Sequence, residues 1–82
     1  MSKFSAQDYQ QNPGKYELFR TAVIDKTVFT SPGEQLLTEG DFVGIEYAGK
    51  ARNQLFRRDE PLYRVKGTDR TLYGNCLRDF VL

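Results

Sequence analysis

A regular alternation of side chains marks one strand near the middle of the chain. From Phe42 to Tyr47, directly after a Gly-Asp turn signal, successive residues belong to opposite faces. Val43, Ile45 and Tyr47 share one face and are β-branched or aromatic, so we expect this face to contact the core. The pattern predicts a strand over residues 40–47, with the rest of the chain arranged around it.

Gly44 lies on the opposite face of this predicted strand, together with Phe42 and Glu46. A glycine inside a strand often marks a bulge, a bend or a close backbone approach, and the strands of a small barrel need such bends to close. The alternative is that Gly44 leaves room for a neighbouring aromatic ring. The sequence leaves both interpretations open.

Short apolar segments separated by turn signals occur on both sides of this strand, and no long helical pattern is present. Further strands are expected at residues 16–24, 54–58, 62–66, 71–73 and 80–82, with turns or connections at 25–39, 48–53, 59–61 and 67–70. The alternation in the first strand is imperfect, which indicates either that both faces are partly covered near its end or that a bulge shifts the phase. Tyr63 and Val65 share a face, Leu36 and Leu37 return the long connection to the core, and Cys76–Asp79 fits a 3-10 turn. This pattern predicts an all-β, small antiparallel barrel of five or six short strands.

Residues 1–15 are polar and are expected to form a flexible N-terminal arm, whereas residues 16–82 form the barrel domain. Ser5 is placed to cap a single helical turn that ends at Gln11. An Asn-Pro-Gly turn follows directly. Phe4 and Tyr9 are the only large apolar groups before that turn, so order in the arm depends on whether they dock on the barrel.

The order of these segments resembles the SH3-like barrel, which has a first strand, a long irregular hairpin loop, an entry strand, a hairpin, a 3-10 turn and a last strand. The entry strand corresponds to the segment from Gly40 to Ile45, and the closing segment to residues 72–82. The chain contains no tryptophan, and it lacks the Ala-Leu-Tyr-Asp-Tyr stretch and the proline before the 3-10 turn of peptide-binding SH3 domains. The resemblance therefore implies the barrel, and it does not extend to binding of proline-rich peptides.

The composition argues against catalysis and against a membrane protein. The 82 residues contain no histidine and one cysteine, Cys76, which removes the commonest general base and excludes an internal disulfide. No metal-ligand spacing and no phosphate-binding loop occur, so we expect no cofactor, no metal and no enzyme activity. There is no apolar run of membrane-spanning length. A free thiol and the absence of a signal peptide predict a cytoplasmic protein.

The charge is unevenly distributed along the chain. Residues 1–46 carry four Lys or Arg and seven Asp or Glu, whereas residues 47–70 carry seven Lys or Arg and three Asp or Glu, a net charge of +4. Cations in this basic segment alternate with aromatic and amide side chains. The candidate contact residues are Lys50, Arg52, Arg57, Arg58, Tyr63, Arg64 and Lys66.

Three interpretations of this basic stripe stay open. It suits an acidic protein surface, because arginine forms bidentate pairs with carboxylates. This predicts a protein-binding adaptor, inhibitor or assembly accessory, by analogy one of phage or mobile-element origin. It also suits phosphate contacts and base stacking in a nucleic-acid binder. Thirdly, the charges form a solvated face or pair with Glu46, Asp59, Glu60 and Asp69. Attraction between the acidic and basic halves of two copies would give a homo-oligomer.

Overall fold

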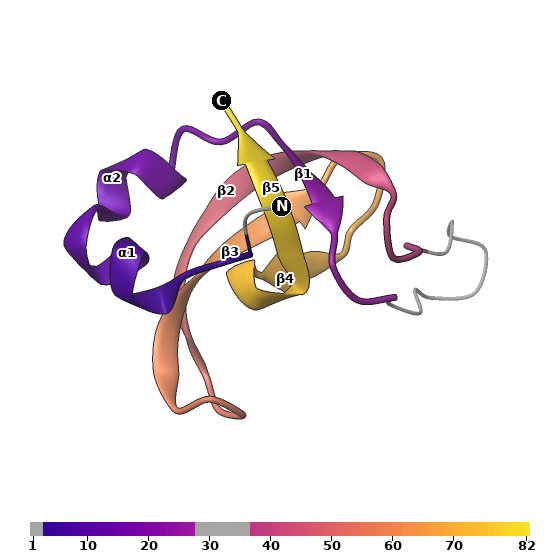
Figure 1. Cartoon of the computed structure of the whole chain (residues 1–82). Coiled ribbons are helices and arrows are strands. Elements are labelled where there is room, and N and C mark those ends of the chain that lie inside the picture. Colours follow the sequence, from indigo (N-terminus) through magenta and orange to yellow (C-terminus); the bar gives the residue numbers. More distant parts are fainter. Residues whose placement is uncertain (1–2, 28–36) are drawn as a thin grey trace.

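The computed structural model describes residues 3–27 and 37–82, and it contains five strands, two short helices and one 3-10 turn (Figure 1). In chain order these are α1 (Ala6–Gln11), α2 (Pro13–Tyr16), β1 (Thr21–Ile24), β2 (Phe42–Asn53), β3 (Arg58–Val65), β4 (Thr71–Tyr73), the 3-10 turn η1 (Gly74–Cys76) and β5 (Leu77–Val81). The expected fold class is confirmed: the chain is mostly β, with a 3-10 turn before the last strand.

All strand pairs are antiparallel, in the order β4-β3-β2-β1-β5. The long strand β2 connects the two halves, because its first residues pair with β1 and its remaining residues pair with β3. Gly44 lies where β2 changes partner: it pairs with Thr21, and its carbonyl accepts a hydrogen bond from the Lys66 amide at 3.0 Å. A Cβ at Gly44 would lie 3.2 Å from Cδ of Lys66. The close neighbour is therefore a lysine side chain, not an aromatic ring.

The predicted faces of β2 are confirmed, whereas its predicted end is wrong. Ile45 is fully buried, and Phe42 on the opposite face is 65% exposed. The strand continues through Asn53, although residues 48–53 were expected to form a connection. It does so across a register shift between Tyr47 and Lys50, where Gly49 has a φ of 107°. A glycine in this conformation allows an irregularity without ending the strand.

The hairpin between β2 and β3 also differs from the prediction. Residues 54–57 form a turn instead of a strand, and the chain reverses direction through Arg57, whose φ is 52°. The Asp59-Glu60-Pro61 segment was expected to end a strand but lies inside β3. The strand tolerates this segment because the carboxylate of Glu60 has hydrogen-bond partners within the protein.

The last part of the chain follows the prediction in its order of elements. Tyr63 and Val65 both face the core, and residues 67–70 form the expected turn. The predicted position of the 3-10 turn, Cys76–Asp79, is wrong: η1 covers Gly74–Cys76, and the residues after Cys76 already belong to β5. Of the two explanations for the imperfect alternation of the first strand, the structure favours the bulge, because the register with β5 shifts between Thr21 and Val23. Strand β1 is shorter than predicted, because the segment before Thr21 contains α2 and a turn.

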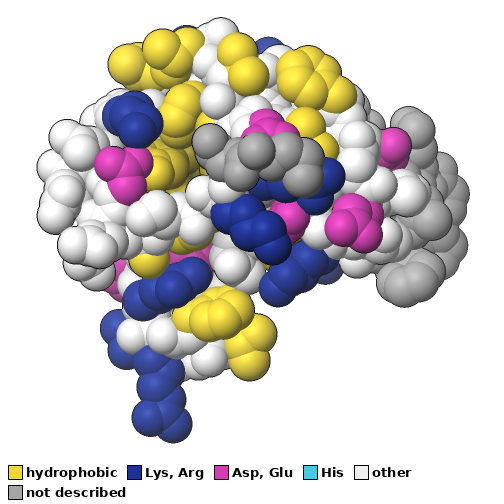
Figure 2. Space-filling view, in the orientation of Figure 1, with side chains coloured by type: hydrophobic (Ala, Val, Ile, Leu, Met, Phe, Trp, Pro, Cys, Tyr) yellow, Lys and Arg dark blue, Asp and Glu magenta, His cyan; other side chains and the backbone are white. Residues whose placement is uncertain are grey.

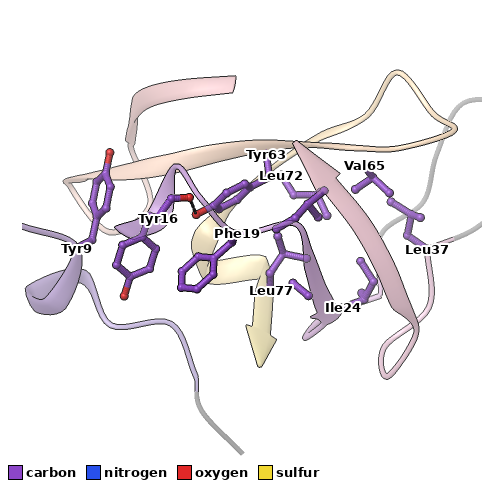
Figure 3. Packing of buried hydrophobic residues seen from close by; sticks show 11 residues of the cluster. Tyr9, Tyr16, Phe19, Ile24, Leu37, Tyr63, Val65, Leu72 and Leu77 are labelled. Atoms are coloured by element: carbon purple, nitrogen blue, oxygen red, sulfur yellow. Dashed lines mark hydrogen bonds between the residues drawn. The ribbon is translucent and has the colours of Figure 1, made fainter. Parts of the chain in front are cut away.

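One hydrophobic core extends along the inside of the curved sheet (Figure 3). Ile24, Leu37 and Val65 lie at one end, and aromatic side chains fill the other end. Leu37 therefore returns to the core as expected, whereas Leu36 and the predicted turn of the long connection lie outside the described residues. At the aromatic end the Tyr63 hydroxyl donates a hydrogen bond to the carbonyl of Tyr16 at 2.8 Å.

The N-terminal arm docks on this aromatic end through both residues on which its order was expected to depend. Tyr9 is buried and Phe4 packs against the core cluster. Ser5 caps α1 as predicted, because its hydroxyl accepts a hydrogen bond from the Asp8 amide. Lys3 also forms an isolated antiparallel bridge with Arg78. The flexibility of the arm in solution stays a prediction.

Asp8 connects the two helices of the arm. Its carboxylate accepts hydrogen bonds from the Tyr16 hydroxyl at 2.6 Å, from Lys15 Nζ at 2.9 Å and from the Asn12 amide at 3.3 Å. These donors, Tyr16 foremost, hold the pKa of the Asp8 carboxyl below its ordinary value. Because the pKa of Asp8 is lower in the folded state, ionised Asp8 stabilises the folded arm at pH values above the ordinary pKa of aspartate. This stabilisation is lost as the pH falls through the folded-state pKa of Asp8.

We predict that Tyr16→Phe raises the pKa of Asp8 towards its ordinary value, because the ring is kept while the strongest donor is removed. The measurement is a pH titration of the Asp8 carboxyl carbon by NMR. Asn12→Ala is the control and should change this pKa less, since its hydrogen bond is longer. An unchanged pKa in Tyr16→Phe would contradict the assignment.

Gly74 provides a test of how closely the arm is seated. A Cβ at this position would lie 2.8 Å from Phe4 Cε1 and 3.0 Å from Pro61 Cγ, whereas a Cβ at Gly14 would have open space. Gly74→Ala should lower the free energy of unfolding by about 1–3 kcal/mol, and Gly14→Ala should leave it unchanged or raise it by up to about 1 kcal/mol. Chemical denaturation measures both. In a Phe4→Ala background most of the Gly74→Ala effect should disappear.

Candidate binding surface

The seven predicted contact residues lie on the β2–β3 hairpin and just after it, but the structure does not assemble them into one stripe. They differ in burial and in the partners that they already have within the protein. Some of these residues lie in the core, some form ion pairs within the protein, and some are available for binding.

Tyr63 is wrong as a contact residue. Its side chain is fully buried, and the hydroxyl donates its hydrogen bond to the backbone of Tyr16. Burial raises the pKa of the Tyr63 phenol well above its usual value. Because Tyr63 faces the same side of β3 as Val65, it packs in the core and is closed to any partner.

Lys50 and Arg64 are exposed but lie beside carboxylates. Arg64 Nη2 is 2.7 Å from Glu46 Oε2, across the β2–β3 pair, and Lys50 Nζ is 3.8 Å from Asp59 Oδ2. Both pairs are exposed enough that they contribute little to stability. They nevertheless reduce the positive charge of the sheet surface, and they confirm pairing with two of the expected acidic residues.

Arg58 is partly buried, and its side chain contacts groups of the same protein. Its Nε lies 2.7 Å from Oε2 of Glu60, whose side chain is fully buried, and the other oxygen of Glu60 accepts a hydrogen bond from the Asn75 amide at 3.1 Å. The guanidinium carbon lies 4.6 Å from the ring centroid of Phe56 and 5.8 Å from that of Phe4. Arg58 therefore lies close to two rings and neutralises a buried carboxylate.

Lys66 belongs to another part of the surface. Its side chain packs against Gly44 and lines a shallow groove of about 440 Å³, together with Asp41, Phe42 and residues of the β3–β4 turn. This groove lies where β2 begins and β3 ends, at the opposite end of these strands from the hairpin turn. Lys66 is thus separated from the other predicted contact residues.

The remaining candidates, Arg52 and Arg57, lie at the end of the hairpin beside two exposed apolar side chains. Leu55 is 80% exposed and Phe56 is 40% exposed. In Figure 1 this hairpin projects from the rest of the sheet, and in Figure 2 the projecting part carries Lys and Arg side chains around a hydrophobic group. We call Arg52, Leu55, Phe56 and Arg57 the hairpin tip.

Two hydrogen bonds close the turn of the hairpin tip. The Asn53 side-chain oxygen accepts from the Leu55 amide at 3.1 Å, and Arg52 Nη2 donates to the Arg57 carbonyl at 3.1 Å. Asn53 is buried, so it anchors the turn to the hairpin. Among residues 3–27 and 37–82, neither Arg52 nor Arg57 lies within ion-pair distance of a carboxylate. The tip therefore combines a positive charge with exposed apolar surface.

Two features of this surface were missed from the sequence. Leu55 and Phe56 were assigned to a strand, which hid their exposure at a turn. Lys26 lies 5.8 Å from the centroid of the Phe56 ring, and because it comes from the segment after β1, no local pattern in the sequence could connect it to the hairpin. The aromatic ring of the tip thus has two cations close to it, Lys26 and Arg58.

Other chemistry is limited in the described part of the chain. Burial raises the pKa of the Cys76 thiol, which lowers its reactivity at neutral pH. Residues 3–27 and 37–82 contain no group of three His, Cys, Asp or Glu side chains that could hold a metal ion. Each helix within these ranges is too short or too polar to span a lipid bilayer.

Comparisons of the chain with models of protein families, with curated proteins and with solved structures found no match. The function proposed below therefore depends on the fold and on the geometry of the surface alone.

We predict that the buried Arg58–Glu60 pair contributes more to stability than the exposed Arg64–Glu46 pair of equal length. Glu60→Gln should lower the free energy of unfolding by about 1–3 kcal/mol, because Arg58 then lacks its counter-charge. Glu46→Gln is the matched control and should change it by less than about 1 kcal/mol. Chemical denaturation at moderate salt measures both values. Equal effects would contradict the structural role of Glu60.

Proposed function

We propose that the chain is a non-catalytic protein-binding module that contacts its partner through the hairpin tip. The observation that carries this proposal is the exposure of Leu55 at the end of a projecting hairpin, next to Arg52 and Arg57. An exposed apolar side chain beside arginines is the composition of a protein-interface anchor. The fitting partner is a protein surface with an apolar pocket and carboxylates at its rim.

The rest of the basic segment favours this function over nucleic-acid binding. Lys50, Arg58 and Arg64 each lie beside a carboxylate of the same protein, so they offer less charge to a phosphate backbone than the sequence suggested. The isoelectric point of about 7.8 is also low for a dedicated nucleic-acid binder. Nucleic-acid binding remains the alternative, and the experiment below distinguishes the two. The expected cytoplasmic location, homo-oligomer and phage origin stay predictions.

The backbone conformation of Arg57 makes it possible to remove its side chain, and thus its contribution to binding, without destabilising the fold. Its φ of 52° is unfavourable for an arginine and favourable for glycine. Arg57→Gly should therefore leave the free energy of unfolding unchanged or raise it by up to about 1 kcal/mol. Partner binding should fall at least about ten-fold, because an anchor side chain is lost. Weaker binding with equal or greater stability is the expected combination.

A photo-crosslinking residue at position 55 provides the binding measurement, in cells that produce the protein naturally. We expect a crosslink to one protein from position 55, about ten-fold less of it in the Arg57→Gly background, and none from the matched control position 42, where Phe42 is also exposed. Nuclease-sensitive adducts would support the nucleic-acid alternative. Equal crosslinking from positions 55 and 42 would contradict a binding role of the hairpin tip.

A further inference from the structure

We infer that the docked N-terminal arm sets the position of the hairpin tip, and that Arg58 is the positioning residue that transmits this control. The inference deepens the function proposed above and rests on it, because it concerns the regulation of the same surface. It depends on a continuous series of contacts from Phe4 in the arm, through Arg58 in β3, to Phe56 in the tip.

The first contacts in this series are two cation–π contacts on one guanidinium group. Arg58 Cζ lies 5.8 Å from the Phe4 ring centroid and 4.6 Å from the Phe56 ring centroid. Phe56 belongs to the turn at residues 54–57, and its ring also lies 5.8 Å from Lys26 Nζ, farther than from Arg58. The Arg58 guanidinium is therefore the nearer of two cations that hold the Phe56 ring against the body of the protein.

Arg58 itself cannot move freely, because its charge is needed inside the protein. Its Nε lies 2.7 Å from Glu60 Oε2, and a fully buried carboxylate without a counter-charge is strongly unfavourable. Glu60 in turn accepts the Asn75 amide at 3.1 Å, which connects the pair to η1. The guanidinium thus has a fixed point at Nε, and its remaining freedom is the orientation of the plane between the two rings.

Phe4 limits that orientation, and its own position depends on the docking of the arm. Its ring packs edge-on against Tyr16 at 5.8 Å and Phe80 at 6.5 Å between ring centroids. A Cβ added at Gly74 would contact the Phe4 ring at 2.8 Å, so the ring lies directly against η1. If the arm detaches, Phe4 leaves this position and Arg58 loses one of its two cation–π contacts.

The consequence is coupling between the arm and the binding surface. With the arm docked, Arg58 is held and Phe56 is ordered against it, which presents the hairpin tip in one conformation. With the arm detached, the guanidinium plane rotates about its bond to Glu60 and the tip becomes mobile. Ordering the tip before binding reduces the entropy that association costs, so docking of the arm raises partner affinity.

The test uses backbone order parameters from NMR relaxation in the full chain without any partner. In Arg58→Lys the charge that pairs with Glu60 is kept while the planar stacking group is lost. We expect the order parameters of residues 54–57 to fall from about 0.85 to below about 0.6, with those of β1 and β5 unchanged. Phe4→Leu should give the same result, because it fills the same position without an aromatic ring. Phe42→Ala, at an exposed phenylalanine outside the series, is the control and should change none of them.

Unchanged order at residues 54–57 in both Arg58→Lys and Phe4→Leu would overturn the inference. A loss of order spread over all strands would also overturn it, because Arg58 would then act on global stability alone. These outcomes do not depend on a partner, so they are independent of the proposed function. Conversely, a missing crosslink from position 55 would remove the proposed function while the coupling of arm and tip could still be measured.

Discussion

The buried carboxylate of Glu60 is the interaction on which the arrangement of the rest of the structure depends. A carboxylate that is buried away from water destabilises the fold unless it has a counter-charge and hydrogen-bond donors. Arg58 supplies the charge and the Asn75 amide supplies the second donor. Through these two contacts one side chain connects the start of β3 with the 3-10 turn, and it fixes where Arg58 can lie. The contacts of Arg58 with the Phe4 and Phe56 rings both follow from that placement.

This requirement also explains why a segment with a net charge of +4 does not form a broad basic surface. Carboxylates within the same domain lie beside Lys50, Arg58 and Arg64. A small domain has little surface, and paired charges on it reduce self-repulsion. What is left for recognition is a small area at the end of one hairpin, where arginines lie beside apolar side chains. Such a surface gains specificity from shape and from a few anchors more than from long-range attraction.

The sequence predicted the regular parts of the fold and failed where charged residues replace the alternating pattern. The faces of β2 could be derived because Ile45 and its neighbours obey a period of two. Residues 48–61 gave no such signal: Gly49 suggested a connection, and Glu60 and Pro61 suggested a turn, whereas the structure accommodates all three inside strands. Whether a strand can contain Glu60 depends on partners that are distant in the sequence, such as Asn75. Tyr63 is a different case, because its alternation with Val65 already indicated the core, and its inclusion among the contact residues contradicted that pattern.

The exposed tip and the buried ion pair are best understood together. The projecting turn contains Arg57 in a left-handed backbone conformation and the exposed side chain of Leu55. Exposed turns of this kind are usually mobile. Arg58 gives the turn a support that originates in the core, because the Glu60 carboxylate needs its charge whatever the tip binds. A buried ion pair is weak evidence for stability by itself, since apolar residues of similar volume often stabilise as well or better. An apolar pair at these positions would fill the space but would remove the nearer of the two cations beside Phe56, leaving only Lys26 at 5.8 Å from the ring centroid. The presence of the ion pair is therefore explained better by positioning of the hairpin than by stability of the core.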